Sequence, residues 1–82
     1  MSIKINHSPK ELLPLNRNTI ETGSWFMFDG AIHLVLRWHV GNKKADILIF
    51  DPTWNIPQLT IFTEDKNKLY TLLDEPEIVL NF

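Results

Sequence analysis

The feature that most constrains this chain is an Asp29-Gly30 pair between two runs of aromatic and aliphatic residues, SWFMF and AIHLVLRWHV. Asp-Gly between such runs is the strongest short-range signal for a two-residue hairpin turn, because both turn residues must adopt positive φ. We therefore predict an antiparallel hairpin with Phe28 opposite Ala31. The rest of the chain must fold around this pair of strands.

Period-two alternation divides the hairpin residues between two faces. One face is almost wholly apolar, and we predict that it forms the core: Trp25, Met27, Ile32, Leu34, Leu36, Trp38 and Val40. The opposite face carries Ser24, Phe26, Phe28, Ala31, His33, Val35, Arg37 and His39. We expect a curled sheet to bury part of this second face as well, as a lesser core of Phe26, Phe28, Val35, Leu48 and Phe50.

A second hairpin is predicted in VGNKKADILIF. A turn at Gly41-Asn42 places Arg37 opposite Asp46, whereas a loop over 41–44 places His39 there. Hydrophobicity does not separate these registers, because they differ by two residues, and the glycine favours the first. QLTIFT at 58–63 is predicted as a further strand, and SIKIN at 2–6 and EIVLNF at 77–82 as terminal strands.

Two short helices are also predicted. In SPKELL, Ser8 and Glu11 have capping-box spacing and Pro9 fits the first helical position. In EDKNKLYTLLDE, residues 64–75, three leucines share one helical stripe and Pro76 follows the end.

Together these elements predict one domain of residues 1–82, mainly β with one or two short helices. Short strands joined by tight turns avoid open edges by curling closed. We expect a small, strongly bent antiparallel sheet or a partly open five-stranded barrel. The element order favours an SH3-like topology, with an OB-like one as the alternative.

Composition excludes several function classes. The chain has no cysteine, and its apolar runs are far shorter than a membrane helix needs. It also lacks metal-binding spacings, phosphate loops and a nucleophile elbow. We predict a cytoplasmic protein that is not an enzyme, contacts no membrane and holds neither a metal nor a cofactor.

The segment DPTWNIPQ, residues 51–58, suggests how the protein acts. Its prolines stiffen a connection between two strands and hold Trp54 in a non-helical segment. One interpretation is that Trp54 plugs an open end of the barrel. The other is a preorganised anchor for a protein partner, because tryptophan leads interface hot spots. On the second interpretation Trp54, Asn55 and Ile56 bind the partner, with Phe28 and Asp29 as a second patch.

The leading functional hypothesis is thus a small module that inhibits or adapts another protein. Compact, mildly acidic domains of this kind are common among effectors of phages and mobile elements. A single-stranded nucleic-acid binder is the alternative, disfavoured by the net charge of −2. Its contact residues would be Phe26, Phe28, His33, Arg37, Lys43 and Lys44. A third hypothesis is a subunit that self-assembles through an open edge at 2–6 or 77–82.

Overall fold

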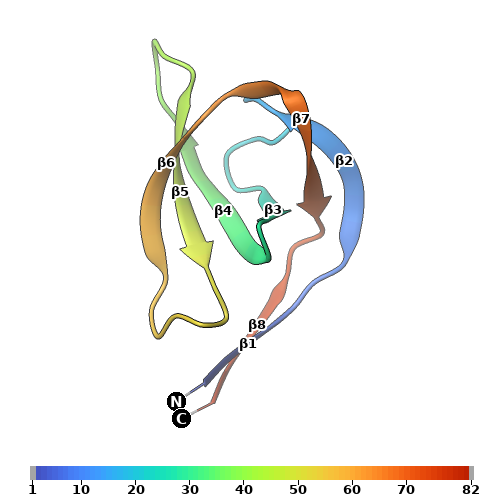
Figure 1. Cartoon of the computed structure of the whole chain (residues 1–82), viewed down its shortest axis with the longest axis vertical. Coiled ribbons are helices and arrows are strands. Elements are labelled where there is room, and N and C mark those ends of the chain that lie inside the picture. Colours follow the sequence, from blue (N-terminus) through green and yellow to red (C-terminus); the bar gives the residue numbers. More distant parts are fainter. Residues whose placement is uncertain (1, 82) are drawn as a thin grey trace.

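The computed structural model describes residues 2–81, with side chains for residues 6–77, and within these residues the chain is all β (Figure 1). It forms eight strands: β1 (Ser2–Asn6), β2 (Pro9–Leu15), β3 (Trp25–Phe28), β4 (Ala31–Trp38), β5 (Lys44–Phe50), β6 (Gln58–Thr63), β7 (Asp65–Leu73) and β8 (Glu77–Asn81). Six of them form one antiparallel sheet in the order β2-β7-β3-β4-β5-β6. β1 and β8 pair as a separate two-stranded ribbon.

The central hairpin has the predicted register. Phe28 lies opposite Ala31 and Phe26 opposite His33. Asp29 and Gly30 take φ values of 51° and 76°, as the favoured two-residue turn requires. Hence the Asp-Gly signal is confirmed, and the strands β3 to β6 follow one another across the sheet as the sequence predicts.

Both predicted helices are wrong, because the two segments form strands β2 and β7, which pair with each other. A single helical turn is costly to nucleate, so a capping signal alone does not sustain it. β7 also pairs with β3, so it gains hydrogen bonds on both sides. The sequence of β7 fits the alternation of a strand as well as it fits a helical stripe, and in the strand Tyr70 and Leu72 face inward. Tertiary pairing decides between the two patterns.

The predicted core face is wrong in part: Ile32 is buried as predicted, but the lesser core predicted on the opposite face contributes the fully buried Phe26 and Val35. A β-bulge in β4 changes the alternation of the residues that follow it. Val35 lies opposite Ile47, but Arg37 lies opposite Asp46, so Leu36 is an extra residue without a partner. The bulge reverses the alternation, and Trp38 faces the same side as Val35. The interior takes the hairpin face that carries Phe26, while Leu36 is exposed and Val40 is 98% exposed.

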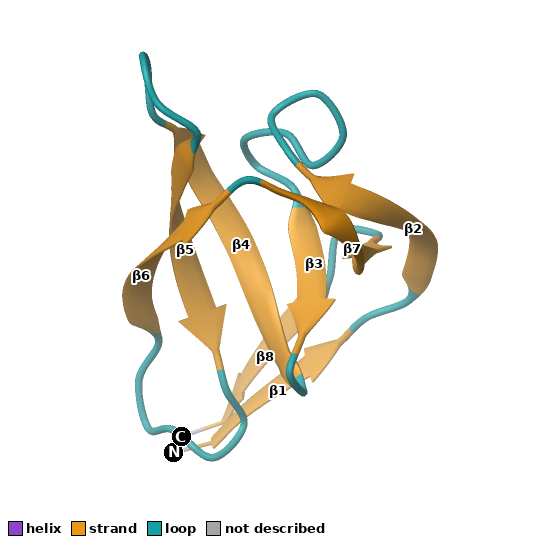
Figure 2. Cartoon of the chain, turned by 45° about the horizontal axis from the view of Figure 1, so that its top comes forward, coloured by secondary structure: helices purple, strands orange, loops and turns teal. Residues whose placement is uncertain are grey.

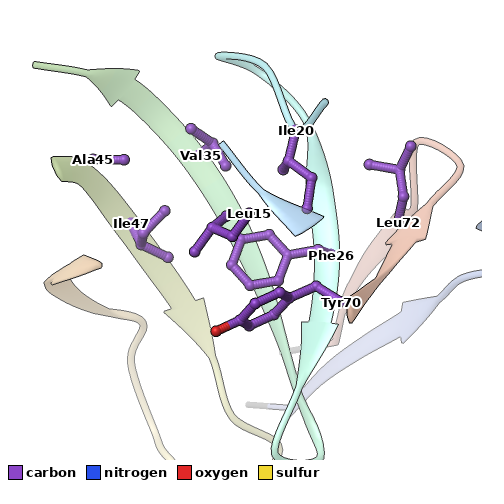
Figure 3. Close-up of a cluster of buried hydrophobic side chains, with 8 residues drawn as sticks. All are labelled: Leu15, Ile20, Phe26, Val35, Ala45, Ile47, Tyr70 and Leu72. Atoms are coloured by element: carbon purple, nitrogen blue, oxygen red, sulfur yellow. The ribbon is translucent and has the colours of Figure 1, made fainter. Parts of the chain in front are cut away.

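The core lies inside the curve of the sheet, and Figure 3 shows the Phe26 ring among the side chains around it. Its buried members are Leu15, Ile20, Phe26, Val35, Ala45, Ile47, Tyr70 and Leu72. Ile20 comes from the loop between β2 and β3. Its carbonyl accepts a 2.8 Å hydrogen bond from the Trp38 indole N–H, which fixes this loop over one end of the core.

The sheet is strongly curved but open (Figures 1 and 2). β6 runs into β7 after a single residue, Glu64, so one continuous stretch of chain passes from one edge of the sheet to the β3 side (Figure 1). The edge strands β2 and β6 do not pair with each other, so the five-stranded barrel is not confirmed. Residues 2–81 contain no helix able to cross a membrane.

Candidate interaction surface

The β5–β6 loop, residues 51–57, is ordered by its first residue. One Asp51 carboxylate oxygen accepts hydrogen bonds from the Thr53 backbone N–H at 2.8 Å and the Thr53 hydroxyl at 2.7 Å. The Asp51 carbonyl accepts a further bond from the Trp54 N–H at 3.0 Å. The bonds from Thr53 hold the pKa of Asp51 below its usual value. With Pro52 and Pro57, these bonds make the loop stiff before any partner arrives.

Trp54 stands outside the core. It keeps 37% of its surface exposed and is not among the residues that pack against the buried cluster. In the described residues its indole joins none of the ring pairs, while Trp25 meets Phe50 at 5.6 Å between centroids. These observations favour the interpretation of Trp54 as an anchor for a partner over its interpretation as a plug in the end of a barrel. Asn55 and Ile56 are exposed beside it.

The strand that follows this loop, β6, exposes two more large apolar side chains. Leu59 is 66% and Ile61 57% exposed. Leu59 is the first of four apolar residues that lie opposite one another on neighbouring strands, on the side of the sheet away from the Phe26 cluster. From β6 through β5 and β4 to β3 they are Leu59, Leu48, Leu34 and Trp25. The last three are half-buried. This row includes Trp25 and Leu34, which the sequence assigns to the core, so part of the face predicted to be the interior remains partly exposed.

A charged cluster borders this row. Asp46, opposite Ile61, binds the Arg37 guanidinium at 2.9 Å and the His39 ring at 2.8 Å. The bond from His39 and then that from Arg37 hold the Asp46 pKa below its usual value. The two predicted registers place either Arg37 or His39 opposite Asp46, and in the structure both side chains contact its carboxylate. Next to the loop of residues 40–43 the backbone keeps the Arg37 register, and on the other side of the bulge the pairing is shifted by one residue, with Leu34 opposite Leu48.

The predicted second patch lies at the same end of the sheet as the β5–β6 loop (Figure 1). Asp29 is exposed at the turn. Phe28 is half-buried in an aromatic cluster with Phe62 and Tyr70, and the Lys68 ammonium lies 4.2 Å from its ring centroid. Lys68 covers this ring face, so Phe28 offers a partner less surface than predicted.

The residues of the nucleic-acid alternative are not brought together. Phe26 is fully buried, and His33 is 3% exposed between Phe26 and Phe62. Neither can stack on a base. Lys43 and Lys44 are exposed, but they lie at the end of the β4–β5 hairpin away from Phe28. Arg37 is paired with Asp46.

His33 is held neutral inside the cluster. Its Nδ1 lies 3.0 Å from the Ala31 carbonyl, which can only accept, so Nδ1 carries the proton. Burial lowers the pKa of His33. In the described part of the chain, no three histidine, aspartate or glutamate side chains gather as a metal site would require.

No protein-family model matches the chain, and no curated protein or solved structure matches it either. The candidate site therefore depends on geometry alone. The sequence proposes Trp54 and Ile56 for this surface, and the exposure of Leu59 and Ile61 adds two residues that it did not propose. The alternation of QLTIFT was visible, but both of its faces carry large apolar residues, and the alternation alone does not show which face lies outward.

Proposed function

We propose that this chain is a small non-enzymatic module that binds another protein, as an inhibitor or adaptor, through residues 54–61. One observation carries the proposal. In the described part of the chain, half of the exposed large hydrophobic side chains fall in this one segment: Trp54, Ile56, Leu59 and Ile61. Single exposed apolar residues are ordinary, but a contiguous patch marks an interaction site.

The segment has the composition and stiffness of a binding site. A rigid tryptophan loses little conformational entropy on binding, so more of its contact energy remains as affinity. Thr53, Asn55 and Gln58 provide hydrogen-bonding groups around the apolar residues, as the polar rim of an interface does. Asp51 and Glu64 place charge outside the patch.

The test compares Trp54→Ala and Ile56→Ser with Leu12→Ser, a control on β2 whose leucine is 58% exposed. Each immobilised variant captures protein from extracts of cells that produce the chain, and the captured protein is then purified and titrated. We expect Trp54→Ala to weaken binding about 30-fold or more, as for a hot spot. Leu12→Ser should bind like the parent chain. Equal binding by all variants would contradict the proposal.

Stability provides the second readout. Because Trp54 is partly exposed and outside the core, Trp54→Ala should lower the free energy of unfolding by about 1 kcal/mol or less. A loss of about 3 kcal/mol or more, typical of emptying an aromatic core site, would establish the plug. Urea denaturation followed by circular dichroism measures the difference.

We further infer that the curved sheet works as a partly open barrel of the SH3-like kind. Two features support this inference: the passage of β6 into β7, and aromatic contacts across the interior, such as Phe28 to Phe62 at 5.6 Å. In such a barrel the opening lies beside β6, where residues 54–61 are found.

A further inference from the structure

β6 is an open edge. Among the strands of residues 2–81, and apart from the start of β7, which follows β6 directly in the chain, only β5 approaches β6 within 8 Å between Cα atoms. The other side of β6 therefore presents backbone N–H and C=O groups without a strand partner. Such a row is a template for pairing with another chain.

This edge lacks three protections that natural sheets use: charged side chains, proline and a β-bulge. Residues 52–63 carry no charged side chain, although 22% of the chain is charged. Within β6 there is no proline, and its pairing with β5 runs without a bulge. Its side chains are threonine, leucine, isoleucine, phenylalanine and one glutamine, all but the last favoured in strands or readily tolerated there.

We propose that β6 pairs antiparallel with β6 of a second copy of this chain, forming a two-fold symmetric dimer. A two-fold contact brings the same patch against itself, so a charged residue on or beside the axis would meet its own like-charged copy. The uncharged run 52–63 avoids this cost. A two-fold axis at Thr60 or at Ile61 keeps Glu64 away from its own counterpart.

The pairing would also extend the apolar outer surface. With an axis at Thr60, Leu59 of one copy lies opposite Ile61 of the other. The apolar row that ends at Leu59 then continues into the second molecule. The two β5–β6 loops lie on either side of the joined strands. This proposal goes beyond the protein-binding function and is tested without any partner.

The first experiment measures mass by sedimentation over a dilution series from about 1 mM to about 1 µM, the range of weak to moderate affinities. We expect a reversible monomer–dimer equilibrium. Ile61→Lys should weaken it at least about tenfold, because each dimer would bring two new like charges close to the axis. The matched control is Leu12→Lys on the other edge, since Leu12 is 58% and Ile61 57% exposed. It should leave the equilibrium unchanged.

A cross-linking experiment keeps the result independent of how well Ile61→Lys folds. Because the chain has no cysteine, Thr60→Cys and Ile61→Cys each introduce a single thiol. Directly opposed residues on antiparallel strands lie about 4.5–5.5 Å apart between Cα atoms, which suits a disulfide. After mild oxidation, the variant at the axis should become a covalent dimer, and Leu12→Cys should stay monomeric.

Three results would overturn the proposal. One is a monomer at every concentration, which would mean that β6 does not pair with a second copy and that any strand added to it comes from a different protein. Another is a dimer that Ile61→Lys and Leu12→Lys weaken equally, which would place the contact elsewhere, such as β1 or β8. The third is a covalent dimer from Leu12→Cys alone. None of these results bears on whether Trp54 binds a partner.

Discussion

The two edges of the six-stranded sheet differ in every property that governs strand pairing. β2 carries Pro9 and Pro14, has charged residues at 10 and 11, and is broken by two register shifts. β6 carries no charge, no proline and no irregularity. Natural sheets use prolines, charges and bulges to block unwanted pairing. The chain thus protects one edge and leaves the other open.

The difference shows that exposure alone does not identify an interaction surface. Leu12 on β2 and Ile61 on β6 are almost equally exposed. Leu12 stands between prolines on a strand whose pairing is interrupted, whereas Ile61 belongs to an uncharged segment, residues 52–63, that contains three more exposed large apolar side chains. The backbone around an exposed side chain decides whether a partner can add to it.

The largest expected effect on stability comes from truncating the side chain that packs each edge strand against the core. Leu15 of β2 is fully buried, whereas Phe62 of β6 is half-buried against Phe26 and Phe28. We expect Leu15→Ala to cost about 2–5 kcal/mol of unfolding free energy. Phe62→Ala should cost less than a fully buried phenylalanine, about 2 kcal/mol. Urea denaturation of both variants measures this; a larger loss at Phe62 would reverse the comparison.

A smaller effect on stability is expected from pH, because the titrating residue His33 packs against Phe62 of β6. The His33 ring lies 5.3 Å from the Phe62 ring between centroids. Burial lowers the His33 pKa below 6.5, so the unfolded chain takes up this proton first as the pH falls. Stability should therefore be complete above about pH 6.5 and decrease between pH 6.5 and the lowered pKa.

The control for this prediction is His33→Asn, which keeps a donor for the Ala31 carbonyl but does not titrate. Its stability should be flatter across the same pH window in thermal unfolding. Asp46 and Asp51 do not interfere with this measurement. Their pKa values are lowered from 3.8, so their contribution to the free energy of unfolding is lost only as the pH falls below 3.8. Parallel curves for the parent chain and His33→Asn above pH 5 would contradict the assignment to His33.

The smallest effect on stability is expected from removing the protection of β2. Pro9→Thr with Pro14→Thr restores two backbone N–H groups and makes β2 resemble β6. We expect a change in unfolding free energy within about 1 kcal/mol. The same variant should, however, form assemblies larger than the dimer, because both edges could then pair. Unchanged mass in sedimentation would show that the prolines are not what blocks β2.

The candidate site was only partly predictable from the sequence. Trp54 and Ile56 were identifiable because prolines fix a loop around them, which is a local property. Leu59 and Ile61 were not, because both faces of QLTIFT carry large apolar residues. Phe26 is buried, as the lesser core predicted from the sequence requires, and the burial of Phe26 and His33 contradicts only the stacking platform of the nucleic-acid alternative. The bulged residue Leu36 reverses the alternation of the β4 residues that follow it, so Trp38 rather than Arg37 faces the core.

The sequence by itself determined the local pairings: the Asp29-Gly30 turn, the register of its hairpin, and the succession of strands from β3 to β6. These depend on backbone preferences of a few neighbouring residues. Only the tertiary structure decided that residues 9–15 and 65–73 are strands, and which face of the sheet forms the core. Their hydrogen-bond partners lie far away in the chain, so the free energy of that pairing is invisible in any short window of sequence. The same reason applies to the edges, because the β6 sequence cannot show that its second neighbour is absent.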